Sequence, residues 1–255
     1  MTEPFKPIYF SIVIPAHNEE DCIEHTCKMI VKEFASHSIS DYEIVVVNDN
    51  SKDRTEELLH ELARRYSTVR YVNNLPPNGF GLAVRKGLEV YRGEVVCVVM
   101  ADLSESPNDI VMYYQKSLEG WECIFGSRFV KGSKVTDYPK GKLVLNRFVN
   151  RFIQFLFWIN LNDITNPFKC YRRNVITGVQ PIVSHHFNLE LELPLKAIIR
   201  GYRWTIVPIS WTNRDAGRSK FHIRKLAGRT LFTLISILAE RWLSGGDYFR
   251  GDKFS

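Results

Sequence analysis

Short apolar runs alternate along the first half of the chain with longer segments in which apolar residues recur every three or four positions. The runs are rich in Val and Ile and have the length of strands buried on both faces of a sheet. We predict strands at Tyr9–Pro15, Tyr42–Asn48, Val69–Val72, Glu94–Val99 and Glu122–Ser127, separated by helices at Glu19–Ser36, Asp53–Tyr66, Gly79–Tyr91 and Pro107–Leu118. This alternation predicts an α/β fold with a doubly wound, mostly parallel sheet and right-handed crossovers.

Two later segments, Lys142–Ile159 and Phe221–Leu243, have a helical pattern in which a narrow polar stripe interrupts apolar residues. Such a helix is buried in protein or in lipid, and basic amphipathic helices can lie in the membrane interface. Packing against the sheet or against a dimer partner is the alternative for both. We therefore divide the chain into an α/β domain over 1–220, with an interface helix at about 142–160, and a C-terminal amphipathic helix and tail over 221–255.

Length, charge and cysteine content narrow the classes of protein. A chain of 255 residues forms one large domain or a domain with an elaborated end. Its formal charge of +6 favours an anionic partner, such as nucleic acid, a phosphate-bearing substrate or a membrane surface. Five cysteines without a CxxC pair argue against a disulfide framework and a zinc site, and indicate a reducing compartment. The N-terminal stretch does not have the pattern of a signal peptide, and no apolar run reaches the roughly 18 residues of a spanning helix.

Three of the predicted strands end in polar sequence: "PAHNEE" from Pro15, "NDNSKD" from Asn48 and "MADLSESP" from Met100. Ligands of open α/β sheets bind beyond the carboxyl ends of the strands, so these acidic ends predict a site for a hydroxylated ligand, a metal or both. The alternative is that Asp49 and Asp53 only cap turns. Asp53 also has capping-box spacing to Glu56 at the start of the second predicted helix.

The glycines of "NGFGLAVRKG", Asn78 to Gly87, bring the backbone close to a neighbouring strand or to a ligand. The segment matches neither the dinucleotide-binding fingerprint nor the P-loop.

Seven motifs stand in a familiar order: "IVIPAHNEE", "EIVVVNDNSKDRT", "NGFGLA", "VVMADLSESP", "GSRFVKG", "DITNPFKCYRR" and "VPISWTNRDAGRSKF". Together they resemble the inverting family 2 glycosyltransferases of GT-A fold, in particular the dolichyl or polyprenyl phosphate mannose synthase branch. The resemblance covers roughly residues 8 to 225. It implies transfer of a sugar, with inversion, from a UDP- or GDP-sugar to a membrane-associated acceptor, most simply a polyprenyl phosphate.

The resemblance also implies roles for the first two strand ends. The residues that it places at the nucleotide are Pro15, His17, Glu19, Val47 and Asp49. His17 occupies a position where the family usually has Tyr, and Asn48 replaces the first Asp of an Asp-Asp-x-Ser pattern. Contact with the base through Val47 and Asp49 is compatible with the change at Asn48.

The fourth strand end matches the metal-binding Asp-x-Asp motif of the family, with Met100 in place of the first Asp. The resemblance implies that Ala101 and Asp102 bind the donor and that Asp102 and Ser104 hold a divalent cation, Mg²⁺ or Mn²⁺. The thioether of Met100 is not a useful ligand for a hard cation, which prefers oxygen. Mg²⁺ nevertheless tolerates several waters in its coordination shell. We therefore expect weak metal binding, with basic residues carrying more of the phosphate charge.

Those basic residues are implied by the same resemblance. Arg128 in "GSRFVKG", with Arg214 and Lys220 in "NRDAGRSK", is expected at the donor diphosphate, where Arg supplies a bidentate fork and Lys a point charge. Arg147 and Arg151 on the predicted interface helix are candidates for the acceptor phosphate.

Asp163 in "DITNPFKCYRR" is the candidate for a sugar hydroxyl contact or a base, and joins Asp102, Arg128 and Arg214 as an expected catalytic residue. A phosphate acceptor is already anionic and needs no strong base. Transfer to a sugar hydroxyl of a polysaccharide or lipid-linked glycan would instead require Asp163, Glu190 or Glu192. On a strand Glu190 and Glu192 point the same way, but on a helix they do not.

A third hypothesis is a catalytically silent homologue that binds a nucleotide sugar or a membrane, suggested by Met100 and Asn48. Nucleic acid is not an expected partner, because Lys and Arg are scattered and no recognised reading module is present. We expect a peripheral protein at the cytoplasmic face of a membrane, and the oligomeric state stays open.

Overall fold

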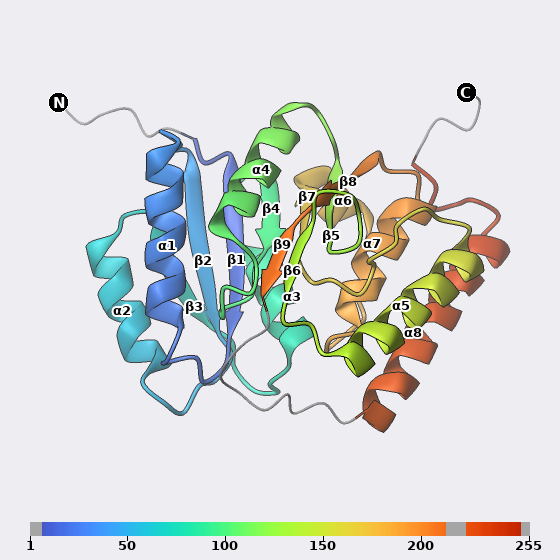
Figure 1. Ribbon diagram of the computed structural model, residues 1–255, viewed down its shortest axis with the longest axis horizontal. Helices are drawn as coiled ribbons and strands as arrows, with labels where there is room; N and C mark the ends of the chain where they lie inside the picture. The colour runs from blue at the N-terminus through green and yellow to red at the C-terminus, as the bar shows by residue number, and fades with distance from the viewer. Residues whose placement is uncertain (1–6, 213–222, 251–255) are drawn as a thin grey trace.

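The computed structural model describes residues 7–212 and 223–250 and has a seven-stranded sheet at its centre (Figure 1). The strands of this sheet are β1 (Phe10–Ala16), β2 (Tyr42–Asn48), β3 (Val69–Asn73), β4 (Val95–Val98), β5 (Cys123–Ser127), β7 (Lys169–Arg172) and β8 (Trp204–Pro208). A separate parallel pair consists of β6 (Lys134–Thr136) and β9 (Ser210–Thr212). The helices are α1 (Ile23–Ser36), α2 (Thr55–Arg65), α3 (Phe80–Val90), α4 (Pro107–Leu118), α5 (Lys140–Phe157), α6 (Arg173–Gly178), α7 (Leu189–Ile199) and α8 (Ile223–Leu243).

The strand order is β3-β2-β1-β4-β7-β5-β8. β1 pairs in parallel with β2 and β4, β2 with β3, and β5 with β8, whereas β7 runs antiparallel to both of its neighbours. The predicted mostly parallel α/β sheet is therefore confirmed, and β7 and β8 are the strands of this sheet that the apolar pattern did not reveal.

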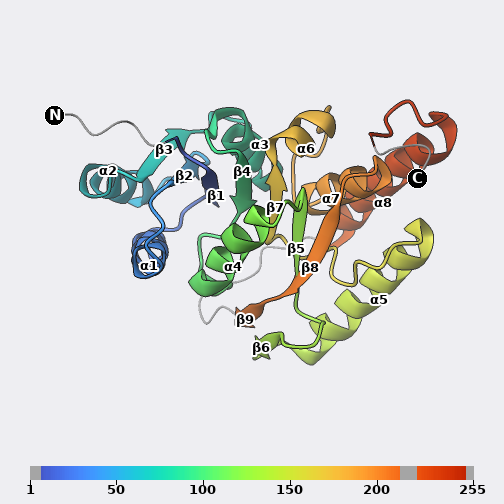
Figure 2. The ribbon, with the colours of Figure 1, turned by 90° about the horizontal axis from the view of Figure 1, so that it is seen from above.

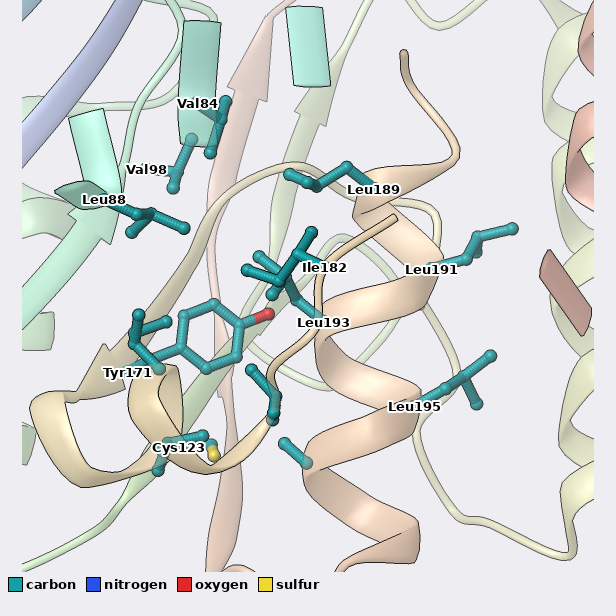
Figure 3. Close-up of a cluster of buried hydrophobic side chains, with 14 of the residues drawn as sticks. Val84, Leu88, Val98, Cys123, Tyr171, Ile182, Leu189, Leu191, Leu193 and Leu195 are labelled. Carbon is teal, nitrogen blue, oxygen red and sulfur yellow. The ribbon is translucent and has the colours of Figure 1, made fainter. Parts of the chain in front are cut away.

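Helices cover both faces of the sheet, with α1 and α4 on one side and α3 and α6 on the other (Figure 2). Alternate residues of β1 point to opposite faces of the sheet. Ile12 and Ile14 pack in the hydrophobic cluster on one face, and Val13 packs in the cluster on the other. Figure 3 shows part of the cluster that contains Val13, where Val84 and Leu88 of α3 and Tyr171 of β7 lie on the side of α7 that carries Leu189 and Leu193, and Leu191 and Leu195 point to its other side.

Two predicted helix starts need correction. α1 begins at Ile23 rather than Glu19, because the backbone N–H groups of Glu19 and Glu20 donate to Thr55 Oγ1 (2.9 Å) and Asp53 Oδ2 (3.1 Å) across the turn. The capping box at Asp53 and Glu56 was wrong: Asp53 Oδ1 accepts from the Thr55 N–H and hydroxyl, and Glu56 accepts from Asn73. α2 consequently starts at Thr55 without a side-chain cap.

The glycines at the start of α3 pack against protein backbone. A Cβ added to Gly79 would lie 2.5 Å from the His185 carbonyl oxygen, and one added to Gly81 would lie 2.7–2.8 Å from backbone atoms of His185 and His186. The Phe80 and Phe187 rings stack with centroids 4.3 Å apart. The two glycines thus let the loop before α7 close over the start of α3.

α5 and α8 are half buried. Ile153 and Phe157 of α5 and Leu234 and Ile237 of α8 join the hydrophobic cluster shown in Figure 3. Their outer surfaces expose apolar side chains: Val144, Leu145, Phe148, Phe152 and Phe155 on α5, and Leu231, Phe232, Ile235, Trp242 and Leu243 on α8. Within residues 7–212 and 223–250, no helix has the length and apolarity needed to cross a membrane.

Candidate active site

The carboxyl ends of β1 and β2 meet at one edge of the sheet because the strands are parallel neighbours. There the His17 ring donates from Nδ1 to the Asp49 carbonyl oxygen (2.7 Å), which also accepts from Asn78 (2.9 Å). The Asp49 carboxylate accepts from the Asn74 amide (2.7 Å) and the Gly79 N–H (2.9 Å). Asp49 therefore joins the first two strand ends to the loop before α3.

The other implied nucleotide residues lie close by. Pro15 and Val47 are partners in the register of β1 and β2, and the Ala101 carbonyl accepts from the Thr26 hydroxyl at 2.6 Å. Asn48 is buried, and its amide donates to Asn73 Oδ1 at 2.9 Å. A carboxylate cannot donate, so the Asn at this position fits its surroundings.

The acidic loop after β4 turns tightly at Leu103, which has a φ of 54°. Asp102 Oδ1 accepts from the Ser104 N–H (3.1 Å) and hydroxyl (2.6 Å), and Met100 is half buried beside them. The described residues contain no group of three or more His, Cys, Asp or Glu side chains able to hold a metal ion.

Glu105 in the same loop was not singled out by the sequence. Its side chain is buried, and neither carboxyl oxygen has a hydrogen-bond partner among the residues that the structure describes. Burial, together with the charge of Asp102, raises the pKa of Glu105 to about 8, against the opposing charge of Arg128. Burial of this carboxyl is a consequence of tertiary packing, so no local sequence signal marks it.

Arg128, directly after β5, is locked by Asp163. Its Nε and Nη2 donate to the two oxygens of the Asp163 carboxylate at 2.8 and 2.7 Å, and its backbone N–H donates to Oδ2 at 2.9 Å. The guanidinium carbon also lies 5.5 Å from the Tyr138 ring centroid and 5.9 Å from that of Trp211. Asp163, with no exposed surface, serves here to position Arg128.

Lys142 joins the site from the first turn of α5, although the sequence analysis did not name it as a site residue. Its Nζ lies 5.9 Å from the ring centroids of both Tyr138 and Trp211. Burial lowers the pKa of Lys142, Arg128 lowers it further, and Asp102 opposes them. A basic residue shortly after "GSRFVKG" at the start of an apolar helix is the signal that would have found it.

The two arginines predicted at the acceptor differ in their surroundings. Arg147 stacks on the Phe129 ring at 4.7 Å, and Arg128 lies 5.4 Å from the same ring. Arg151 is exposed one turn farther along α5. Arg214 and Lys220, predicted at the donor phosphates, lie outside the described residues.

The sequence model of the family described as "Glycosyl transferase family 2" matches residues 11–178. The chain belongs to this family. It is 30% identical over 215 residues to a polyprenol monophosphomannose synthase of Mycolicibacterium smegmatis, covering 82% of this chain and 79% of the relative. It is also 30% identical over 254 residues to a dolichol-phosphate mannosyltransferase of Pyrococcus furiosus, covering 96% and 67%. These relatives support the polyprenyl phosphate mannose synthase branch.

Solved structures of this glycosyltransferase fold include glucosyl-3-phosphoglycerate synthase from Mycobacterium tuberculosis. Its complex with Mn²⁺, UDP and glucosyl-3-phosphoglycerate has a TM-score of 0.65 at 18% identity, covering 92% of this chain and 80% of that one. A second complex, with Mn²⁺ and UDP-glucose, has a TM-score of 0.66 at 18% identity, covering 92% and 79%. The likeness confirms the GT-A fold.

Glu190 and Glu192 of α7, the other carboxylates considered as bases, are both in ion pairs. Because α7 is a helix, Glu190 and Glu192 point in different directions. Glu190 Oε2 lies 3.6 Å from Lys169 Nζ, and Glu192 Oε1 lies 2.7 Å from Lys196 Nζ. Burial raises the pKa of Glu190 to about 7, against the opposing charge of Lys169. Glu192 also accepts from the Ser184 N–H at 2.8 Å, which holds the loop before α7.

Proposed function

We propose that this glycosyltransferase moves a sugar, with inversion, from a UDP- or GDP-sugar to a polyprenyl phosphate. The observation that supports it best is the state of the three candidate bases. Asp163, Glu190 and Glu192 are all held in ion pairs, so none is available as a free base for a hydroxyl acceptor. A phosphate monoester needs no such base, since it is already anionic at neutral pH.

The acceptor side of the site is basic instead. Arg128, Lys142 and Arg147 come together around Phe129, Tyr138 and Trp211. Positive charge at this place offsets the repulsion between an anionic acceptor and the donor diphosphate. Arg151, Arg214 and Lys220 are proposed to extend this charge.

The chemical step follows from these positions. An acceptor phosphate oxygen forms a bond to the anomeric carbon while the bond from that carbon to the donor diphosphate breaks, and the nucleoside diphosphate leaves with the electron pair. Attack opposite to the leaving group inverts the anomeric configuration. Asp163 keeps Arg128 in place for the charge that develops.

The donor is proposed to lie along the strand ends, with its nucleoside near Pro15, His17 and Asp49 and its diphosphate near Asp102. A divalent cation bound through Asp102 and Ser104 would neutralise charge on the diphosphate. One further residue of this loop suits a cation, although the sequence did not indicate it. The buried carboxyl group of Glu105 has no hydrogen-bond partner among the described residues.

The lipid part of the acceptor is matched by the outer surfaces of α5 and α8. Phe148 and Phe155 are 69% and 74% exposed and lie on the helix that carries Lys142 and Arg147. An apolar helix surface beside a cationic site suits a peripheral position at a membrane, proposed to be its cytoplasmic face. The names of the two mannose synthase relatives indicate the same acceptor chemistry.

The direct test is transfer from a panel of radiolabelled UDP- and GDP-sugars to a short polyprenyl phosphate in detergent, with Mg²⁺, Mn²⁺ or EDTA. We expect a labelled lipid product that is lost in Asp102→Ala. Labelled glycan but no lipid product would favour a hydroxyl acceptor. Nucleotide binding without transfer to any acceptor would identify a silent binding protein.

Membrane contact is tested by co-sedimentation with anionic vesicles. The double variant Phe148→Ser, Phe155→Ser should lose most vesicle binding while keeping its thermal stability, since both side chains are largely exposed. Leu118→Ser, 59% exposed at the end of α4, is the matched control. If Leu118→Ser lost as much vesicle binding as the double variant, α5 would have no specific role in membrane contact.

A further inference from the structure

Glu105 has no structural partner that explains its burial. It is 1% exposed, and within residues 7–212 and 223–250 both carboxyl oxygens lack a hydrogen-bond partner. Buried carboxyl groups are normally satisfied by donors or cations, and one that is not calls for a functional explanation. Replacement by an apolar residue would remove the cost, so the fold alone does not account for a glutamate here.

Two buried cations are already engaged by other carboxylates. Arg128 is paired with Asp163 at 2.7 Å and Lys169 with Glu190 at 3.6 Å. Asp102 adds a further carboxylate, close enough for its charge to act on Glu105. The loop after β4 therefore carries two carboxyl groups, Asp102 and Glu105, and Glu105 takes no part in these two ion pairs.

Hydrogen bonds also tie the loop to neighbouring segments. The chain reverses at Leu103, the Ser104 hydroxyl donates to Asp102, and the Thr212 N–H donates to the Ser104 carbonyl at 3.1 Å. Glu105 itself forms an antiparallel bridge with Trp211. Asp102, Ser104 and Glu105 are thus carried on one short turn anchored to the strand pair β6–β9.

We propose that Glu105 supplies the second carboxylate of the divalent cation site, in place of the one lost at Met100. The inference rests on the proposed function, because it assumes a cation at the donor diphosphate. A hard cation prefers carboxylate and hydroxyl oxygens to a thioether, and Glu105 carries the carboxylate that Met100 cannot supply. Cation binding would at the same time give the buried carboxylate a partner.

The test is Mn²⁺ binding, followed by the EPR signal of free Mn²⁺, in the presence of UDP or GDP. Wild type, Glu105→Gln, Met100→Asp and the double variant are compared, so that the result does not depend on sugar transfer. We expect Glu105→Gln to weaken Mn²⁺ binding by about tenfold or more, since losing even an outer partner of a metal ligand has effects of that size. In a protein that already carries Met100→Asp, Glu105→Gln should weaken Mn²⁺ binding by less than about a third as much. The carboxylate introduced at position 100 then does the work of Glu105.

Two controls separate metal binding from folding. Glu190→Gln removes another buried carboxylate, one that is already paired with Lys169, and should change Mn²⁺ affinity much less. Metal-free Glu105→Gln should melt at the wild-type temperature or above it, because an unsatisfied carboxyl is replaced by a neutral amide.

Three results would overturn the inference. Glu105→Gln could bind Mn²⁺ as tightly as wild type, or it could lose the same Mn²⁺ affinity with and without Met100→Asp. The third is wild type that binds no Mn²⁺ in the presence of either nucleotide. Failure of the proposed function looks different, since it would appear as absence of nucleotide binding or of lipid product. Sugar transfer that persists in EDTA, with no Mn²⁺ binding, would leave the proposed function standing and remove only the role of Glu105.

Discussion

At the scale of single residues, the role of Asp163 is to hold the Arg128 side chain in place. The carboxylate accepts three hydrogen bonds from Arg128, and the pair is almost fully enclosed. Removing one partner of a buried ion pair leaves an uncompensated charge, which is much more costly than the loss of the contact itself.

We expect Asp163→Asn to lower the free energy of unfolding by about 3–5 kcal/mol and to reduce transfer, because Arg128 loses its counter-charge. Urea denaturation measures the first effect. Asp137→Asn is the control, since Asp137 is exposed with a φ of 54° that Asn also tolerates. A loss below about 1 kcal/mol in Asp163→Asn would show that Arg128 does not depend on this pair.

Glu43 of β2 is also buried, but its pKa shifts in the opposite direction from that of Glu105. Burial by itself raises the pKa of Glu43, but hydrogen bonds from Arg70, Ser11 and the Arg92 N–H outweigh it and hold the pKa below its ordinary value. The ionised form is thus favoured by folding, so Glu43 stabilises the protein above pH 4.5, the ordinary value, and less as the pH falls below it.

Glu43→Gln should therefore be less stable than wild type by about 1–3 kcal/mol at pH 7, as expected for hydrogen bonds to a charged group. The difference should shrink as the pH is lowered below 4.5. Urea denaturation at a series of pH values measures it. Glu89→Gln, an exposed residue of α3, should show no such pH dependence, and a constant difference for Glu43→Gln would contradict the assignment.

At the scale of elements, the contact between α3 and the loop before α7 depends on glycine. Gly81, the second residue of α3, faces the backbone of His185 and His186, with a Cβ there only 2.7 Å from either. Gly141 has the same place in α5, but no atom of the described part of the chain lies within 4 Å of an added Cβ.

Gly81→Ala should destabilise the protein by about 1–3 kcal/mol, the usual effect of overpacking, because backbone rather than a flexible side chain must move. Gly141→Ala should be neutral or stabilising by up to about 1 kcal/mol, since Ala loses less entropy in a helix. Thermal unfolding of the pair measures both. Equal effects at the two positions would mean that the loop before α7 does not pack closely on α3.

Elements with a strong local pattern were predicted well. The bounds of β2 and α4 were predicted residue for residue, because their apolar positions follow the period of a strand or a helix. The elements that were not assigned include β7, β8 and α7. β7 has only four residues, one of them the buried Lys169, and α7 includes Pro194 and carries Glu190 and Glu192 on different sides, so neither shows a clear period.

At the scale of the whole molecule, α8 is part of the common core. Leu234 and Ile237 are 5% and 1% exposed and belong to the same cluster as Val13 of β1 and Tyr171 of β7. Arg200 of the loop after α7 also pairs with Glu240 of α8 at 2.7 Å. The division of the chain at residue 220 stays a prediction, and this packing favours one cooperative unit.

Ile237→Ala should lower the stability of the entire fold by about 2–5 kcal/mol, as for other large-to-small core substitutions, and leave a single unfolding transition. Calorimetry and near-UV circular dichroism measure it. Ile235→Ala, 56% exposed on the same helix, is the control and should have little effect. A separate low-temperature transition in Ile237→Ala, with the main one unchanged, would support independent folding of the C-terminal segment.

The sequence by itself determined the alternation of strands and helices, the polar strand ends and the family, because these depend on local periods and on the order of short motifs. Tertiary structure decided which charges meet. Arg128 and Asp163 are 35 residues apart, Lys169 and Glu190 are 21 apart, and no local pattern pairs them. It also decided that Glu105 is enclosed without a partner, since burial is set by the segments that pack around a residue and not by its neighbours in the chain.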